Sequence, residues 1–269
     1  MRTEEGFRGA GDPSKYRTAR EAESHSTGTP NWTNALRFQK DVFTFVRIKY
    51  KVDGKHGFGH TEDRWAIDMP DSDLNLSYRL QQMTSIKVNP DGRILELTDK
   101  ELFDYPFIYI VEPGRLTFTP EEATILRSYL LNGGFLMVDD FWGDRELKNF
   151  LEELRSVFPE REPVELPLEH PIFHCVFDLK EKPQVPGVEW GIASEHTGIT
   201  WENHGPGSQE VHYKGIFDDK GRLMVMLCHN TDLGDGWERE GENEYYFKQF
   251  SEKKAYPLGI NIIYYAMTH

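Results

Sequence analysis

Residues 101–143 contain two short apolar runs on either side of a helix signal, and this pattern strongly restricts the fold. The apolar runs at residues 107–111 and 135–138 have the length of buried strands. A strand, a short helix and a second strand in this order place the two strands side by side and parallel. The sequence therefore predicts an α/β protein with a mostly parallel sheet flanked by helices.

The helix between these runs has recognisable start and stop signals. Thr119 has the position of an N-cap, Pro120 that of the first helical residue, and Glu122 completes a capping box. Gly133-Gly134 then indicates where the helix ends.

Apolar patterns elsewhere predict more elements. Residues 86–88 and 94–97 flank a turn and indicate either a hairpin or a short strand with a loop, and residues 230–249 are expected to be irregular. A helix is expected to begin near Asp71 or Ser72. Other helices are predicted at 145–158 and 258–267, and other strands at 42–50, 164–168, 176–179, 188–193, 215–218 and 223–228.

The chain divides into two parts by composition. Residues 1–40 are rich in Gly, Ser, Thr and charged residues and indicate a flexible N-terminal arm. Residues 41–269 have the strand and helix patterns of one large α/β domain.

The chain is acidic, with a formal net charge of −14. Such a charge disfavours binding to nucleic acid or to anionic membranes and suits a neutral or cationic ligand, or a metal. The apolar runs are too short for a membrane span, and the first 40 residues lack the apolar segment of a signal peptide. We expect a cytoplasmic protein if Met1 is the natural start, and a periplasmic location is the alternative if a leader preceded it.

The cysteines and most histidines give little sign of metal binding. Cys175 and Cys228 are predicted to be buried free thiols, and no Cys/His zinc spacing is present. His170 and His174 are four residues apart, but Pro171 argues against the helix that would bring them together. His56 and His60 are predicted to lie in a solvent-exposed, glycine-rich loop.

Several longer motifs resemble an uncharacterised bacterial domain family of the class I glutamine amidotransferase-like superfamily, whose members occur alone or behind von Willebrand factor A-type modules. These motifs are Asp68-Met69-Pro70-Asp71, LFDYPFIYIVEPG, LRSYLLNGGFLMVDDFWG, HPIFH, KGRLMVMLCHNTDLGDGWE and GINIIYYAMTH, within residues 43–269. The resemblance implies a flavodoxin-like sheet flanked by helices, and it implies no reaction. A weaker likeness to the trehalose-utilisation branch of the superfamily is an analogy at the level of the fold.

One departure from the superfamily concerns the nucleophile. Its amidotransferases have a cysteine at a tight turn between a strand and a helix. In this chain Asp139, Asp140 and Phe141 follow the comparable strand, and no Cys, Ser or Thr is present there. Thiolate chemistry requires a nucleophile beside a base, so the sequence argues against glutaminase activity.

Candidate catalytic residues follow two predicted strands. Asp139 and Asp140 come after one, and His229 comes after another. If the chain is an enzyme, the carboxylates can bind a metal or activate water, and the histidine can ligate or transfer a proton. A divalent metal is therefore a candidate cofactor. Structural roles in capping and turns are the alternative.

Candidate ligand-binding residues lie at the same strand ends. Because parallel strands gather their carboxyl ends at one edge, we expect Glu112, Asp139, Asp140, His229 and Asp232 to line one depression, with Trp142 or Trp237 on its wall. Aromatic platforms beside carboxylates are suited to sugars, and core packing is the alternative for these tryptophans. The candidate ligand-binding set is Glu112, Trp142, Asn230, Asp232, Asp235 and Trp237.

Two functions follow from these patterns. The first is a ligand-binding or accessory module that retains an amidotransferase-like scaffold without the nucleophile. The second is a hydrolase, metal-assisted and carbohydrate-directed, that uses the strand-end carboxylates and the histidine. The ligand, the partner and the oligomeric state do not follow from the sequence.

Overall fold

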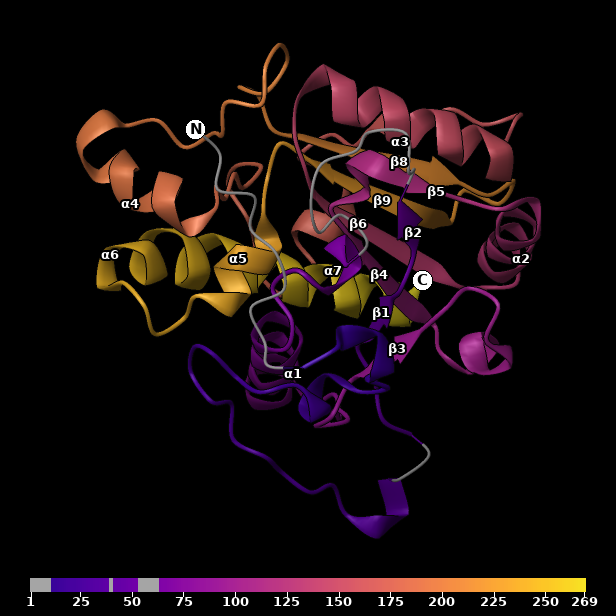
Figure 1. Ribbon diagram of the computed structural model, residues 1–269, viewed down its shortest axis with the longest axis horizontal. Helices are drawn as coiled ribbons and strands as arrows, with labels where there is room; N and C mark the ends of the chain where they lie inside the picture. The colour runs from indigo at the N-terminus through magenta and orange to yellow at the C-terminus, as the bar shows by residue number, and fades with distance from the viewer. Residues whose placement is uncertain (1–10, 39–40, 53–62) are drawn as a thin grey trace.

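A seven-stranded sheet forms the centre of the protein (Figure 1). The computed structural model describes residues 11–38, 41–52 and 63–269, so His56 and His60 lie outside the described residues. The strands have the order β3-β1-β4-β6-β9-β8-β7. Their bounds are Val46–Ile48 for β1, Arg93–Leu95 for β3, Phe107–Val111 for β4, Phe135–Phe141 for β6, Val164–Glu165 for β7, His212–Phe217 for β8 and Leu223–His229 for β9.

The sheet is mostly parallel, as the sequence predicts. Five adjacent strands run parallel to one another, in the order β3-β1-β4-β6-β9. Strand β8 pairs antiparallel with β9, and β7 pairs antiparallel with β8. A second, antiparallel sheet consists of β2 (Lys51–Val52) and β5 (Leu116–Thr117). The α/β prediction is confirmed, and this arrangement is consistent with a flavodoxin-like fold.

Helices cover both faces of the large sheet. Ile108 and Ile110 of β4 pack with α2 and α3 on one face, and Tyr109 packs with α1, α5 and α7 on the other. This alternation follows from the pleat of a strand. The α-helices are α1 (Asp71–Met83), α2 (Pro120–Leu131), α3 (Gly143–Val157), α4 (Val188–Thr197), α5 (Leu233–Glu238), α6 (Glu244–Tyr246) and α7 (Tyr256–Thr268), with the π-helix η8 (Phe247–Ala255) between the last two.

Short 3₁₀ helices occupy several of the connections. They are η1 (Pro13–Lys15), η2 (Ala19–Glu21), η3 (Leu36–Phe38), η4 (Arg64–Ala66), η5 (Lys100–Asp104), η6 (Pro113–Arg115) and η7 (Pro171–Phe173).

Helix α2 begins and ends where its sequence signals place it. The Thr119 side chain accepts a hydrogen bond from the Glu122 N–H, and the Glu122 carboxylate accepts one from the Thr119 N–H. After Leu131 the chain turns at Gly133, which has a φ of 109°. A Cβ on Gly134 would stand 2.3 Å from the Tyr129 ring. Both glycines are therefore required where the chain leaves α2 for β6.

The first strand–helix–strand unit, β1-α1-β3, is also parallel. Strand β3 pairs parallel with β1, and Val88 forms a parallel bridge with Phe43. Residues 86–88 and 94–97 therefore do not form a hairpin, and the alternative of a short strand with a loop is correct.

Three other expectations about secondary structure are wrong. Residues 188–193 lie in helix α4, because a short apolar run does not distinguish a strand from a helix. Residues 176–179 form no strand, because the N–H groups of Val176 and Phe177 donate to the side chain of Asn261 instead. Residues 230–249 contain helices α5 and α6, which the side chains of Asp232 and Asn243 cap.

The N-terminal segment, residues 11–38, lies against the rest of the protein. Ala19 and Ala22 are buried in the core beside β3. The Ile94 N–H at the outer edge of β3 donates to the Arg17 carbonyl. Further along, Ser24 and the N–H groups that follow it bind the Asp71 carboxylate at the start of α1.

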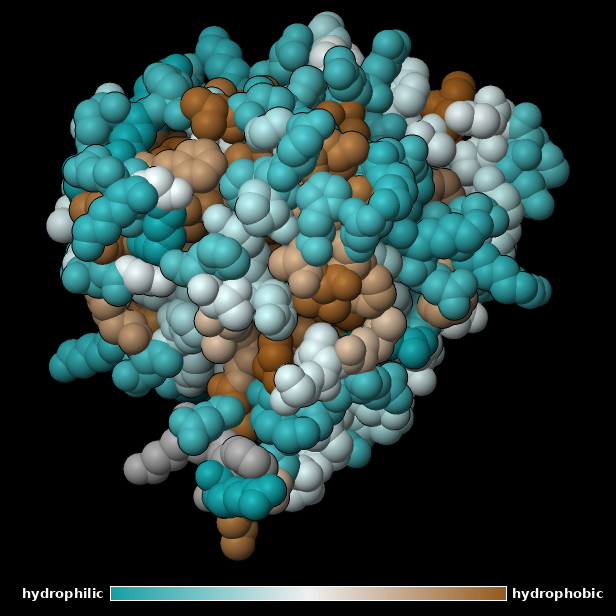
Figure 2. Space-filling view, turned by 180° about the vertical axis from the view of Figure 1, so that it is seen from behind, coloured by the Kyte–Doolittle hydropathy of each residue, from teal (hydrophilic) through white to brown (hydrophobic). Residues whose placement is uncertain are grey.

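The surface is largely polar. Figure 2 shows hydrophilic side chains over most of the rear face, interrupted by a few hydrophobic areas. Among the described residues no helix combines the length and apolar content that a membrane span requires. Cys175 and Cys228 are free thiols, as predicted. Cys228 is buried in β9, whereas the expectation that Cys175 is buried is wrong, because it is only half-buried.

Candidate functional site

The carboxyl ends of β4, β6 and β9 meet at one edge of the sheet. Val111 pairs with Asp139, and Phe141 pairs with His229, with an irregularity between Val138 and Phe141. This pairing brings together the acidic residues that follow the three strands.

A cavity of about 740 Å³ opens at this edge. Seven of its lining residues are acidic: Asp68, Glu112, Asp140, Glu189, Glu202, Asp232 and Asp235. The basic lining residues are Arg64, Arg145 and His204, and the remaining ones are Ile67, Gly187, Val188, Trp190, Ala193 and Asn203. Of the predicted ligand-binding residues, Glu112, Asp232 and Asp235 therefore line the cavity, together with Asp140.

Backbone strain is concentrated around this cavity. Among the described residues, Asp68, Glu112, Asp140 and Asn230 are the non-glycine residues with positive φ, at 64°, 47°, 54° and 59°. The first three line the cavity. A left-handed backbone costs an L-residue about 1–2 kcal/mol, and such residues cluster at functional sites.

Glu112 is held by an ion pair inside the cavity. Its Oε2 lies 2.9 Å from Nη1 of Arg64, and both side chains are buried. Burial acts to lower the pKa of Arg64, but Glu112, Tyr50 and further carboxylates together outweigh it. The pKa is therefore raised, and the guanidinium stays charged. The Tyr50 hydroxyl donates to the carbonyls of Val111 and Glu112, at 2.8 Å each, and fixes the backbone at the end of β4.

Asp140 faces the same cavity and is supported from behind by Trp142. The indole Nε1 donates to Asp140 Oδ1 at 2.9 Å, and the Trp142 side chain is buried. Burial and the nearby charges of Glu112 and Glu202 raise the pKa of Asp140 well above its usual range. The expectation that Trp142 forms a wall of the cavity is wrong, because its ring packs beneath Asp140 and beside His204.

Three more carboxylates converge on Gly187, just before α4. A Cβ at this glycine would stand 3.0 Å from Glu202 Oε1, 3.2 Å from Asp235 Oδ2 and 3.5 Å from Asp232 Oδ2. The Gly187 N–H donates to Glu202 and the Val188 N–H donates to Asp235. Burial and neighbouring carboxylates, Asp140 first, raise the pKa of Asp232 well above its usual range.

Asp139 lies outside the cavity and caps helix α5. Its Oδ2 accepts hydrogen bonds from the N–H groups of Leu233, at 2.9 Å, and Gly234, at 3.0 Å, and from the Tyr109 hydroxyl, at 3.2 Å. Burial raises the pKa of this carboxyl to about 7. The expectation that Asp139 lines the cavity with Asp140 is wrong, because successive residues of a strand point in different directions.

His229 is also outside the cavity, so the expectation that it shares a depression with Asp140 is wrong. The ring lies 5.0 Å from that of Phe141 and 6.0 Å from that of His212. Its Nε2 lies 3.2 Å from the Gly143 carbonyl, which requires the proton on Nε2. Burial lowers the pKa of His229 to about 4, so the ring is neutral at physiological pH.

The remaining predicted residues, Asn230 and Trp237, have structural surroundings. The Asn230 side chain accepts from the Gly143 N–H and donates to the carbonyls of Gly207 and Glu210, which ties the loop before β8 to the start of α3. Trp237 is fully buried, and its ring packs against Tyr109. The expectation that Trp237 lies on the wall of the cavity is wrong.

Several cavity residues do not follow from the sequence patterns. Asp68 and Glu202 come from irregular segments without a local pattern. Trp190, which is 41% exposed, is an aromatic residue that does line the cavity. The apolar run at residues 188–193 predicts a strand, and only its helical form, α4, turns this ring outward.

Comparison with known families bears on the same region. A family model described as "Domain of unknown function (DUF4159)" matches residues 44–267. The chain belongs to this family. The DUF4159 match includes the whole seven-stranded sheet and every residue that lines the cavity, and it leaves the N-terminal segment outside. A comparison with curated proteins found no match.

Proposed function

We propose that this chain is a ligand-binding module whose cavity binds a small organic cation, such as an alkylamine or a guanidinium compound. The observation that carries the proposal is the charge of the cavity. Seven acidic residues line it, against two arginines and one histidine. Asp68, Glu112, Glu202, Asp232 and Asp235 are buried. Burying five carboxylates in one place is costly unless protons or cations compensate them.

The bound cation would replace protons on the cavity carboxyls. Burial is the largest cause of the raised pKa values of Asp140 and Asp232, and neighbouring carboxylates add to it. An ammonium or guanidinium group offers several N–H donors to such oxygens. Its positive charge also compensates the negative charge of the carboxylates, whose burial is costly.

Trp190 adds an apolar contact for the same ligand. It is partly exposed on α4, and it lines the cavity together with Val188 and Ala193. A cation over an indole face gains about 0.5–2 kcal/mol. The cavity thus offers both a charged wall and an aromatic one.

The scaffold of the proposed module is amidotransferase-like and lacks the nucleophile. The parallel neighbours β1, β4, β6 and β9 support this relationship. After β6 the chain has Trp142 and Gly143 at the start of α3, so a thiol for glutaminase chemistry is missing at that turn.

Calorimetric titration of the whole chain tests the proposed function. Alkylamines and guanidinium compounds should bind in buffer with a metal chelator, and neutral sugars and carboxylic acids should not. Asp140→Asn and Trp190→Ala should each weaken binding about tenfold. Glu121→Gln, an exposed acidic residue on α2, is the matched control. Equal affinities in all variants would reject the cavity as the binding site.

A hydrolase is the second candidate, and a specific pair of residues favours it. Asp140 has a raised pKa, whereas Glu112 in the same cavity faces the Arg64 guanidinium. Two carboxyls in such different surroundings are suited to act as general acid and general base. Trp190 would then stack on a sugar ring. The test measures release of chromophore from aryl glycosides. Release that is lost in Asp140→Asn and in Glu112→Gln, but retained in Glu121→Gln, would favour this function.

A further inference from the structure

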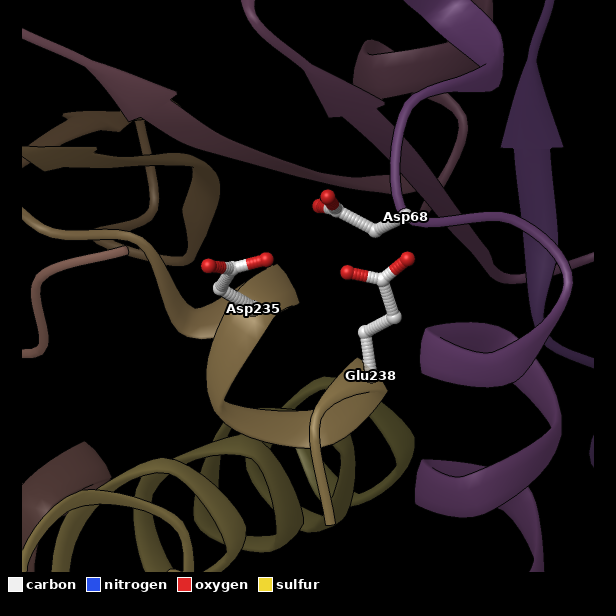
Figure 3. Close-up of side chains that lie close together, drawn as sticks. All are labelled: Asp68, Asp235 and Glu238. Atoms are coloured by element: carbon white, nitrogen blue, oxygen red, sulfur yellow. The ribbon is translucent and has the colours of Figure 1, made fainter. Parts of the chain in front are cut away.

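Three carboxylates meet at the floor of the cavity, between α5 and the loop that precedes α1 (Figure 3). They belong to Asp68, Asp235 and Glu238, and one oxygen of each lies within 4.8 Å of the other two. All three side chains are buried, and Asp68 and Asp235 line the cavity. Figure 3 shows the three carboxylates close together, with Asp68 on the loop and Asp235 and Glu238 on α5.

The charges of this cluster are only partly balanced. Arg239 Nε donates to Asp235 Oδ1 at 3.1 Å and lies 2.5 Å from Glu238 Oε2. The imidazole of His25, from the N-terminal segment, lies 3.1 Å from Glu238 Oε1. Arg239 is the guanidinium that contacts the cluster, and three carboxylates around it leave an excess of negative charge.

One oxygen of Asp68 gives an independent indication that the cluster requires a cation. Its Oδ2 is buried and lacks a hydrogen-bond partner among the described residues, and the whole residue is 93% buried, with 7% of its surface exposed. The oxygen points at α5: a Cβ on Gly234 would stand 2.1 Å from it. A buried, unpaired carboxylate oxygen is costly, so this atom requires either a proton or a cation.

We propose that Asp68, Asp235 and Glu238 bind one divalent cation of the size of Ca²⁺. Carboxylate oxygens are the ligands of hard cations. Mg²⁺ usually keeps several waters and takes only one or two carboxylates, whereas Ca²⁺ accepts more oxygen ligands in a flexible geometry. Three carboxylates gathered within 4.8 Å of one another therefore favour the larger ion. Water from the cavity completes the coordination, and the charge of the ion offsets the excess negative charge of the cluster.

The partners already present would hold the ligands in place. Arg239 and the Val188 N–H both donate to Asp235, so its carboxylate is fixed before an ion arrives. His25 orients Glu238. Hydrogen bonds of this kind to ligating carboxylates typically change metal affinity by 10- to 100-fold. Gly234 leaves room for Asp68 to approach α5.

The inference goes beyond the proposed function, because it assigns a metal ion to the floor of the cavity rather than an organic cation to its walls. The experiment uses the whole chain, stripped with a chelator, and titrates Ca²⁺ by calorimetry and Tb³⁺ by luminescence sensitised by tryptophan. One ion per chain should bind, with a rise in Tm. Asp68→Asn should weaken binding at least about tenfold, and Glu121→Gln should bind as the unmodified chain does.

Asp68→Asn is a mild substitution for this test, because Asn tolerates the left-handed backbone that Asp68 adopts. If no ion binds up to about 1 mM, the weak end of known calcium sites, the inference is overturned. A higher Tm in Asp68→Asn would then indicate that the cluster shares a proton instead. The two proposals separate cleanly. Trp190→Ala should weaken amine binding and leave ion binding unchanged. Amine binding measured with chelator present does not depend on the ion.

Discussion

The carboxylates of Asp139 and Asp140, neighbours in β6, point into different parts of the molecule: Asp139 binds the first N–H groups of α5, and Asp140 lines the cavity. The positive φ of Asp140, 54°, breaks the regular path of the strand between them. The pair therefore separates two roles at one strand end, one of holding the fold and one of facing a ligand. Each role has its own measurable consequence.

Asp139→Ala should destabilise the protein by about 2–4 kcal/mol, because the N–H groups of Leu233 and Gly234 would lose their buried acceptor. Urea unfolding at neutral pH gives this value, with Glu121→Ala as the surface control. A loss within about half a kcal/mol, typical of surface substitutions, would contradict the capping role.

Asp140→Asn should stabilise the protein at alkaline pH by about 1 kcal/mol and have little effect at acidic pH. Burial raises the pKa of Asp140 in the folded state, so its contribution to stability is present below the unfolded pKa and is lost as pH rises through the folded value. The amide removes the charge and retains an acceptor for Trp142. Tm of both proteins, measured from acidic to alkaline pH, tests the sign of this stability difference. The sign reverses if the structure stabilises the charged carboxylate.

His229→Gln should make the protein less sensitive to acid. The pKa of His229 is lowered to about 4, so the folded state binds the proton less readily than the unfolded chain. Stability that is present above the usual pKa of about 6.5 is therefore lost as pH falls towards 4. The difference in unfolding free energy between the two proteins should grow within that window, and a constant difference would show that the ring titrates normally.

Asp71→Ala should release the N-terminal segment and cost about 2–3 kcal/mol. The carboxylate accepts from Ser24 Oγ at 2.5 Å, from the His25 N–H at 2.9 Å and from the Ser26 N–H at 3.2 Å. Limited proteolysis should then cut residues 11–38 faster. Asp91→Ala is the control, because its ion pair with Arg20 is partly exposed and worth less than about 1 kcal/mol.

Local signals explain how much of the fold was predictable. The capping box of α2 and the apolar runs on either side are complete within residues 107–138, so this unit follows from the sequence. Helix α4 does not, because residues 188–193 form a short apolar run that suits either a strand or a buried helix. Its start depends on Asp235, which binds the Val188 N–H from a distant part of the chain.

The candidate site was predictable only in outline. The gathering of strand ends brings Glu112, Asp140 and Asp232 to one cavity, as the parallel topology implies. The direction of each side chain depends on the irregular end of β6, which no residue pattern reveals. Asp68 and Glu202 reach the cavity from loops, whose course depends on tertiary contacts rather than on sequence period.

The hydrogen bond from Ile94 to the Arg17 carbonyl has a consequence for association between molecules. Strand β3 is the outermost strand on its side of the sheet. An open edge strand is a template on which another chain can add, and proteins commonly cover it. Because Arg17 lies outside the family match at residues 44–267, a fragment limited to the match would expose this edge. The N-terminal segment thus covers the edge of β3 and disfavours association of molecules through this strand.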